Sequence, residues 1–235
     1  MVTDDLELPW ELMHDGEEYL CLKRPVTRMP LRRAFPRRRR RPIPATGDRV
    51  RALFVAADPS GDLPRAVEEV VKVSEALQRR WGRSVDFEVL TGEAATGRRL
   101  NEELRWGSYH LVHFAGHAAF DDRNPQRSAL VLHDGELYFA QKAERLLEGR
   151  RLVFLNACET SATANDEVVG DPVASYVAAK AQGLAAAFMY GGAAACVGSL
   201  WPVYDDTAQS LAIAFYDELF RGNRAGEALR QARLH

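Results

Sequence analysis

A cysteine and a histidine, Cys158 and His117, are the residues of this chain best suited to covalent chemistry. His117 follows the run Leu-Val-His-Phe-Ala-Gly, and Cys158 follows Leu-Val-Phe-Leu-Asn-Ala. A nearby imidazole can deprotonate a thiol and later protonate a leaving amine, which is the minimum apparatus for peptide hydrolysis. Position alone favours a plainer interpretation, in which Cys158 is a small buried residue and His117 an ordinary turn residue.

The rest of the sequence predicts the elements that must position these two residues. From Arg49 onward, short β-rich apolar runs alternate with longer amphipathic segments, a pattern typical of parallel strands joined by helical crossovers, so the expected fold class is α/β. Ligands bind beyond the carboxyl ends of strands in open α/β sheets, so both residues should face one crevice if their strands are neighbours. We expect strands at 50–57, 85–90, 109–115, 151–156 and 194–200, and helices at 64–81, 96–106, 141–147, 172–188, 207–220 and 225–234.

A β-hairpin should interrupt this alternation. Two short β runs, 129–133 and 137–140, are separated by Asp134-Gly135, which is the strongest short hairpin signal. The run at 151–156 is apolar throughout, as expected for a central strand that is covered on both faces.

Composition predicts one globular domain with an N-terminal extension. The chain has 235 residues, of which 46% are hydrophobic and 27% charged, and its net charge is −2, so it has no general bias toward polyanions. Charge is nevertheless segregated, because residues 25–47 carry eight arginines and no acid. We therefore divide the chain into an extension at 1–48, with an Arg-rich loop, and a core at 49–235.

Cysteine usage and hydropathy predict a cytoplasmic protein. Three cysteines in a chain this long do not form a disulfide framework, and no basic-then-apolar leader follows Met1. The longest apolar stretch, 184–201, is broken by three glycines and consists mostly of small residues. We interpret it as a helix end, a turn and a buried strand, and expect no membrane span.

The sequence around the two reactive residues resembles that of the CHAT family. The ordered blocks are HFAGHAAF, LVLHDG, LVFLNACETS, GLAAAFMYGGAAACVGSLWPVYDD and AGEALRQA, and the opening LPWELMHDGEEYLCLKR is similar to the segment that precedes the CHAT core. CHAT domains are grouped with caspases, separases and gingipains. The resemblance implies a caspase-like three-layer sandwich, with a mostly parallel central sheet, helices on both faces and an inserted β-hairpin.

The resemblance also implies roles for individual residues. Cys158 in NACET would be the nucleophile and His117 in AGHA the general acid/base, and no carboxylate is required in this family. The backbone N–H groups of Cys158 and Ala118 would hold the oxyanion. Family members commonly have glycine where this chain has Ala118, and alanine resists positive φ at a cost of about 1–2 kcal/mol. This departure keeps a second hypothesis open, a scaffold or binding module that has lost turnover.

Acidic residues near the expected crevice suggest a specificity pocket. Asp121, Asp122, Asp205 and Asp206 all fall in predicted loops, although most exposed acids are simply solvated. The resemblance favours Asp205 and Asp206 as the lining of a pocket for Lys or Arg before the cut. Trp201 would supply a hydrophobic wall instead.

Two other interpretations of the reactive residues are weaker. His113, His117 and Cys158 could be a zinc site, but a four-residue histidine spacing needs a helix and this segment is predicted to be a strand. We expect no metal and no other cofactor, with His113 packed beneath the dyad. A flavodoxin-like module would rest on Asp58 at the end of the first strand, but the chain lacks a glycine-rich phosphate loop and the hairpin does not fit.

The run Arg37 to Arg41, flanked by Pro36 and Pro42, bears on partners. It has no interleaved aromatic residues for base stacking, so we expect a solvated loop and no specific nucleic acid. It could also be a processing loop, since clan relatives cut themselves in exposed basic segments. The resemblance implies a protein substrate, control by an activating partner or a fused sensor or repeat domain, and regulated cleavage, often in bacterial defence or cell death.

Overall fold

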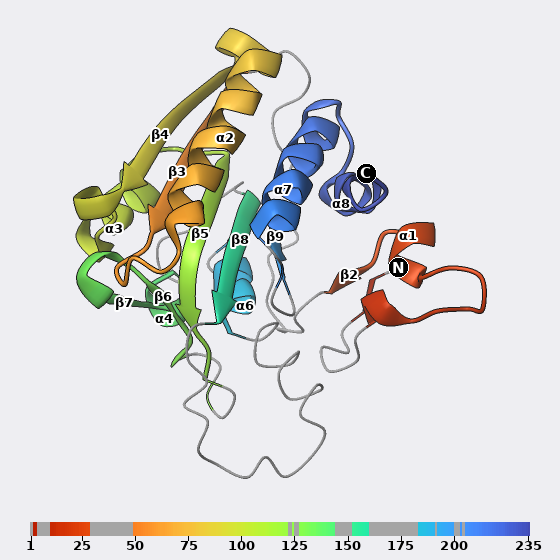
Figure 1. Cartoon of the computed structure of the whole chain (residues 1–235), viewed down its shortest axis with the longest axis horizontal. Helices are drawn as coiled ribbons and strands as arrows, with labels where there is room; N and C mark the ends of the chain where they lie inside the picture. The colour runs from red at the N-terminus through yellow and green to blue at the C-terminus, as the bar shows by residue number, and fades with distance from the viewer. Residues whose placement is uncertain are drawn as a thin grey trace.

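A seven-stranded mixed sheet organises the chain (Figure 1). The computed structural model describes residues 2–3, 10–28, 49–121, 124, 127–143, 152–159, 183–190, 192–199, 203 and 205–235. The parallel part of the sheet has the strand order β4-β3-β5-β8-β9. These strands are β3 (Val50–Ala57), β4 (Val85–Thr91), β5 (Leu111–Ala119), β8 (Leu152–Glu159) and β9 (Ala195–Gly198).

The predicted hairpin is present and extends the sheet beside β5. Strands β6 (Ala129–Val131) and β7 (Leu137–Phe139) pair antiparallel. β3 ends level with Gly116, and β6 then takes its place next to β5. The connection spans residues 132–136 rather than the two predicted residues, and Asp134 and Gly135 supply its positive φ angles of 55° and 74°.

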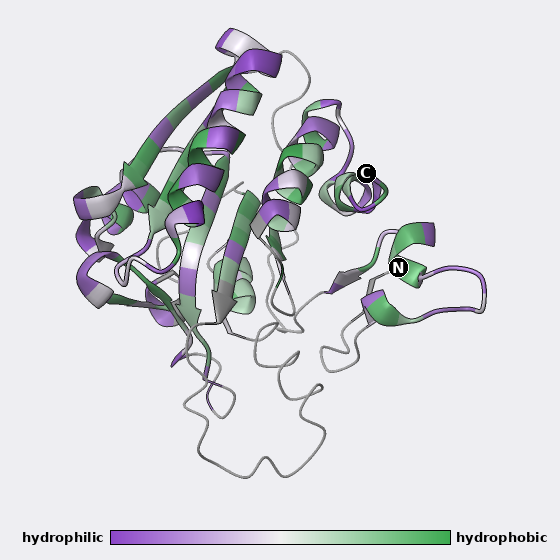
Figure 2. Cartoon of the chain, viewed as in Figure 1, coloured by the Kyte–Doolittle hydropathy of each residue, from purple (hydrophilic) through white to green (hydrophobic). Residues whose placement is uncertain are grey.

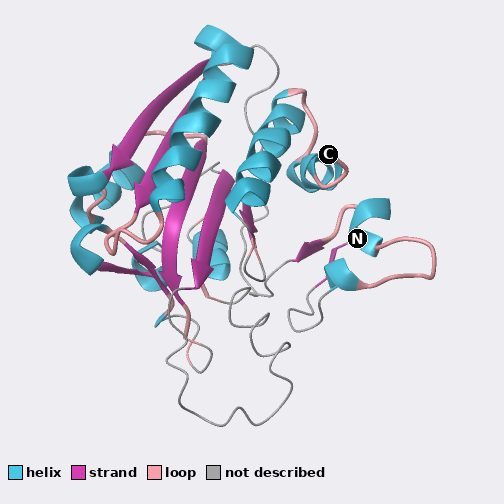
Figure 3. Ribbon diagram, in the orientation of Figure 1, coloured by secondary structure: helices cyan, strands magenta, loops and turns pink. Residues whose placement is uncertain are grey.

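Helices cover both faces of the sheet, so the chain has an α/β fold (Figure 3). Side chains on β5 alternate between two buried clusters, because successive residues of a strand point to opposite faces. One cluster lies under α2 (Pro64–Trp81), α7 (Asp205–Phe220) and α8 (Ala225–Ala232), and the other under α3 (Gly97–Trp106) and α6 (Leu184–Tyr190). Figure 2 shows that α2 combines hydrophobic and hydrophilic residues along its length, as expected of an amphipathic helix.

The described part of the N-terminal extension packs against α8. It contains β1 (Val2–Thr3), α1 (Leu20–Lys23) and β2 (Thr27–Arg28), and the two strands pair in parallel. Arg230 of α8 donates a hydrogen bond to the Leu22 carbonyl at 3.0 Å. Within the described residues, no helix combines the length and the apolar character that a membrane crossing needs.

Most predicted elements are confirmed, and two strand ends are corrected. β3 and α2 have the predicted bounds. The remaining described elements are α4 (Ala140–Ala143) and short 3-10 helices at Trp10–Leu12, Gly82–Ser84, Gly92–Ala94 and His133–Gly135. The predicted strands at 109–115 and 151–156 extend further, so His117 and Cys158 lie within β5 and β8 instead of beyond them. Residues 144–147 and 172–182 of the predicted helices lie outside the described residues.

Gly116 permits this extension of β5. A Cβ atom at this position would lie 2.5 Å from the Ala57 carbonyl oxygen, and the φ angle of Gly116 is 155°. Since a backbone oxygen cannot move aside without displacing β3, only glycine fits here. The residue therefore marks a close approach of two strands and not the end of one.

Replacing Gly116 by alanine should destabilise the fold. We expect Gly116→Ala to lower the free energy of unfolding by about 1–3 kcal/mol, as overpacking does. Gly198→Ala in β9 is the matched control, because its added Cβ meets nothing closer than the Leu155 carbonyl oxygen at 3.6 Å; it should change stability by about 0.5 kcal/mol or less. Urea unfolding of both variants is the measurement, and equal stability of the two would contradict this explanation.

Candidate active site

The backbone register of β5 and β8 brings the two predicted reactive residues together. His117 is the direct partner of Cys158 across the parallel pair, in a run of pairs that extends from Leu111↔Leu152 to Ala118↔Glu159. Neighbouring strands lie about 4.8 Å apart. The side chain of Cys158 lies outside the described part of the chain. The two strands are thus neighbours, as the expected chemistry requires.

The imidazole of His117 is buried and has one hydrogen-bonded nitrogen. The residue is 5% exposed. Its Nε2 lies 2.8 Å from Oδ1 of Asp62 and 4.0 Å from Oδ1 of Asp58. Its Nδ1 is buried without a hydrogen-bond partner among the described residues. One nitrogen is therefore engaged by a carboxylate, and the other is available.

The loop between β3 and α2 holds the two carboxylates in place. Asp58 follows the last residue of β3, and its Oδ1 accepts the Leu63 N–H at 3.1 Å. The Ser60 hydroxyl donates to the same oxygen of Asp62 that contacts His117. The hydrogen bond from Ser60, and then the one from His117, lower the pKa of Asp62 below its usual value. Asp62 is therefore ionised at neutral pH.

Sequence reasoning missed Asp62. The sequence connects Asp58 only with a nucleotide-binding module, and the family resemblance calls for no carboxylate. The available signal was the acid-containing turn Asp58-Pro-Ser-Gly-Asp62 directly after a predicted buried strand. Its contact with His117 spans 55 positions of the chain, and no local pattern encodes such a contact.

The zinc set suggested by the sequence is not assembled in the described residues. Both ring nitrogens of His113 are occupied, Nδ1 by the Tyr216 hydroxyl and Nε2 by Oε1 of Glu69, each at 2.9 Å. A different group is within reach of an ion: one ligand atom each of Asp58, Asp62 and His117 lie within 4.8 Å of one another. Acidic groups at a surface commonly gather in this way without a metal.

A buried polar network lies one layer below His117 and Cys158. His113 is fully buried, and its ring stacks on Phe154 with 5.1 Å between centroids. Glu69 of α2 receives a second hydrogen bond from Nδ2 of Asn156 at 2.6 Å. The network therefore joins α2, α7, β5 and β8, and Asn156 lies only two positions before Cys158.

Donor and acceptor roles in this network follow from charge. Burial, and then the charge of Glu69, raise the pKa of Tyr216 well above its usual value, so its hydroxyl keeps its proton. An ionised Glu69 only accepts hydrogen bonds, which puts a proton on Nε2 of His113. The Tyr216 hydroxyl can then donate to Nδ1 of the same ring. Both ring nitrogens of His113, the Tyr216 hydroxyl and both oxygens of Glu69 have a partner in this arrangement.

The backbone at Ala118 carries no strain. Among the described residues other than glycine, only Ser108 and Asp134 have positive φ angles. Ala118 lies in extended β5, between Leu130 of β6 and Glu159 of β8. The conformational cost expected of an alanine after the histidine therefore does not arise.

The acids predicted for the specificity pocket have different surroundings. Asp206 is an exposed residue of α7, and its Oδ1 lies 2.8 Å from Nη1 of Arg65 in α2. Asp205 is the first residue of α7, and its side chain lies outside the described part of the structure. Asp121 lies two residues after the end of β5, and its Oδ2 is 3.8 Å from Nε of Arg127. Asp122 and Trp201 are outside the described residues.

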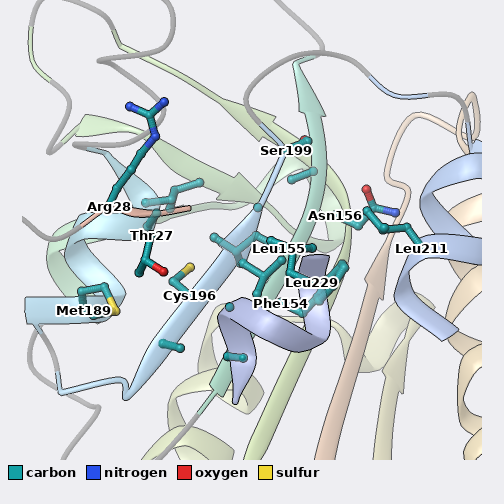
Figure 4. A pocket seen from close by; sticks show the side chains of 18 of the residues that line it. Thr27, Arg28, Phe154, Leu155, Asn156, Met189, Cys196, Ser199, Leu211 and Leu229 are labelled. Atoms are coloured by element: carbon teal, nitrogen blue, oxygen red, sulfur yellow. The ribbon is translucent and has the colours of Figure 1, made fainter. Parts of the chain in front are cut away.

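A separate cavity of about 400 Å³ surrounds the edge strand β9 (Figure 4). Asn156 lines it, and His117 and the two loop aspartates do not. Cys196 also lines the cavity, and burial raises the pKa of its thiol to about 12. The Cys196 thiol therefore stays protonated near neutral pH and is a poor nucleophile.

Breaking the buried network should cost stability. We expect His113→Phe, which keeps the ring but removes both nitrogens, to lower the free energy of unfolding by about 1–3 kcal/mol, because Glu69 and Tyr216 lose a buried partner. Tyr216→Phe removes a single hydroxyl and should cost about 1 kcal/mol. Thermal and urea unfolding provide the measurement. If His113→Phe were as stable as the parent protein, the network would not stabilise the fold.

Comparison with protein families identifies the chain. A family model described as the CHAT domain matches residues 6–235. A search of curated proteins found no match. The family match covers almost the whole sequence and includes both strands that carry His117 and Cys158. The chain therefore belongs to the CHAT-domain family, a family associated with caspase-like cysteine peptidases.

Proposed function

We propose that this protein is a cysteine endopeptidase that uses Cys158 and His117 as its catalytic dyad. The observation that carries the proposal is the register pair His117↔Cys158 in a chain of the CHAT-domain family. Residues opposite each other on adjacent strands share one face of a sheet, so a thiol and an imidazole at these positions are within reach of each other. The α/β architecture with helices on both faces supports a caspase-like three-layer fold.

The reaction needs one proton shuttle and one covalent intermediate. His117 takes the thiol proton of Cys158, and the thiolate sulfur bonds to the peptide carbonyl carbon. His117 then gives the proton to the leaving amine as the C–N bond breaks. Water, deprotonated by the same imidazole, hydrolyses the thioester and restores the thiol.

Backbone N–H groups of Ala118 and Cys158 would stabilise the oxyanion in this reaction. One such donor contributes on the order of 10²–10³ in rate. The alternative function, a binding module without turnover, drew its support from strain expected at Ala118. The extended backbone at this residue removes that reason for preferring it.

A dedicated protein substrate fits this family better than general digestion. The resemblance implies regulated cleavage, with an activating partner or a fused sensor domain as the trigger and bacterial defence or cell death as the setting. The fold does not determine the substrate, because the loops around the site do.

Removing either member of the dyad should abolish peptide hydrolysis. We expect Cys158→Ala and His117→Ala each to lower turnover by about 10³-fold or more, since members of a catalytic set act as a unit. Mass spectrometry of a peptide library of varied sequence, incubated with each protein, measures the loss for whichever peptides the wild type cleaves. Cys196→Ala is the control and should keep activity, because the Cys196 thiol stays protonated near neutral pH and lines a cavity that does not include His117.

Inhibitors provide a second arm of the same experiment. Iodoacetamide should destroy the activity and EDTA should leave it unchanged, because the proposed chemistry needs a thiolate and no metal. Wild-type turnover in either dyad variant would contradict the assignment. Zinc bound stoichiometrically and lost in Cys158→Ala would contradict the absence of a metal.

The enzyme should prefer Lys or Arg before the cut if Asp205 and Asp206 line the pocket. The ion pair of Asp206 with Arg65 is exposed at both ends, so it contributes at most about 1 kcal/mol and a substrate cation can compete for the carboxylate. Asp205→Ala and Asp206→Ala should each weaken the preference several-fold in a peptide panel. Arg65→Ala should strengthen it. A preference for an uncharged residue that neither aspartate replacement alters would contradict the pocket.

The same preference would make the chain its own substrate. The run Arg37 to Arg41 lies outside the described residues. Cleavage should fall within it and spare the bond before Pro42, because proline lacks the N–H and the flexibility that proteases need. Intact-mass analysis of concentrated wild type beside Cys158→Ala detects the cut. An intact run in active enzyme would contradict self-processing alone.

A further inference from the structure

We propose that Asp62 is a positioning residue that selects the nitrogen with which His117 acts. The carboxylate holds the proton of His117 on Nε2, so Nδ1 is the nitrogen that accepts the proton of Cys158. Asp58, whose Oδ1 lies 4.0 Å from Nε2 of His117, places a second carboxylate near the same ring nitrogen. The inference rests on the proposed function, because it assigns a role within the same dyad.

The contact between Asp62 and His117 fixes a tautomer. An ionised carboxylate can only accept, so the 2.8 Å contact requires a proton on Nε2. A neutral imidazole carries one ring proton, which leaves Nδ1 with its lone pair. Nδ1 is also the buried nitrogen without a partner among the described residues. The nitrogen that must act as a base is therefore the one left unoccupied.

The two carboxylates also favour the charged ring that forms when Nδ1 takes a proton. Among the described residues, the acids within 4.0 Å of the His117 ring are Asp58 and Asp62, both from the loop between β3 and α2. On β8 the residue opposite is Cys158, and on α2 the buried Glu69 contacts His113 instead. The Asp58 side chain is 10% exposed and that of Asp62 is 62% exposed. Solvent therefore screens the charge of Asp62 more than that of Asp58.

The loop is built to keep an exposed carboxylate in one place. Ser60 donates to Asp62, and Asp58 accepts the N–H of Leu63 at the residue before α2. Pro64 begins the helix with a fixed φ, which orients the loop that precedes it. These contacts hold the exposed carboxylate of Asp62 against a buried ring nitrogen of His117.

Histidine NMR in the Cys158→Ala protein tests the inference without any substrate. ¹⁵N shifts of His117 should show the Nε2–H tautomer. Asp62→Asn keeps an acceptor oxygen, so the tautomer should persist. Asp62→Ala removes the acceptor, so the tautomer preference should be lost. Asp62→Glu should restore the Nε2–H signal.

The hairpin supplies a matched control for this NMR measurement. Asp134 lies 3.3 Å from Nε2 of His133, and it is exposed like Asp62. Asp134→Ala should change the ¹⁵N shifts of His133 and leave those of His117 unchanged, and Asp62→Ala should do the reverse. If the tautomer of His117 did not respond to Asp62→Ala, the inference would be wrong. A His117 spectrum that changes on adding EDTA would also overturn it, because the acids would then belong to a metal site.

Kinetics separate this inference from the dyad itself. In the protein with Cys158 intact, Asp62→Ala should lower kcat about 10–100-fold with little change in KM. A wild type that cleaves nothing would count against the proposed peptidase, even if the NMR result holds. Activity that needs Cys158 but is unchanged in Asp62→Ala would count against the positioning role alone.

Discussion

The register between β5 and β8 is the constraint on which the candidate site depends. A slip by one residue would place His117 opposite Ala157 or Glu159 and would turn one strand's side chains to the other face. The Leu152 N–H donates to the His110 carbonyl at 2.8 Å at the start of this pair. The His110 N–H donates to the Arg51 carbonyl of β3, also at 2.8 Å, so the same residue joins the strands on both sides.

Packing on both faces maintains that register. On one face Val112 and Phe114 join the cluster under α3 and α6, and on the other His113 stacks on Phe154. The polar network of His113 restricts the relative positions of the packed elements further, because hydrogen bonds need a defined geometry and dispersion contacts do not. Two histidines of one strand thus differ through their surroundings. Both nitrogens of His113 are hydrogen-bonded, whereas one nitrogen of His117 has no partner among the residues that the structure describes.

Helices and strands whose ends are marked by a local proline or glycine could be predicted from the sequence. Contacts between residues far apart in the chain could not. β3 and α2 have their predicted bounds because Pro64 begins the helix and Gly82 follows it. The strand end at Gly116 was wrong, because a glycine that usually ends an element here permits the close approach of Ala57. The family resemblance suggested His117 and Cys158 as the dyad, which remains a prediction, but the acid that contacts His117 depends on how a loop folds back over the sheet. The ion pair of Asp206 with Arg65 escaped prediction for the same reason, since it joins helices 141 positions apart.

The order of the strands explains how a site of this kind can arise from a simple sheet. Asp58 follows β3, His117 lies in β5 and Cys158 in β8, and these are three adjacent parallel strands in the order β3-β5-β8. Parallel strands present their carboxyl ends at one edge, so the backbone positions of Asp58, His117 and Cys158 fall at the same edge of the sheet, where the proposed proton transfer would take place. The core holds these three positions. The loops at that edge can then vary to select a substrate without moving the strands that carry the proposed dyad, and for this reason a reaction can be proposed from the sheet while the substrate cannot.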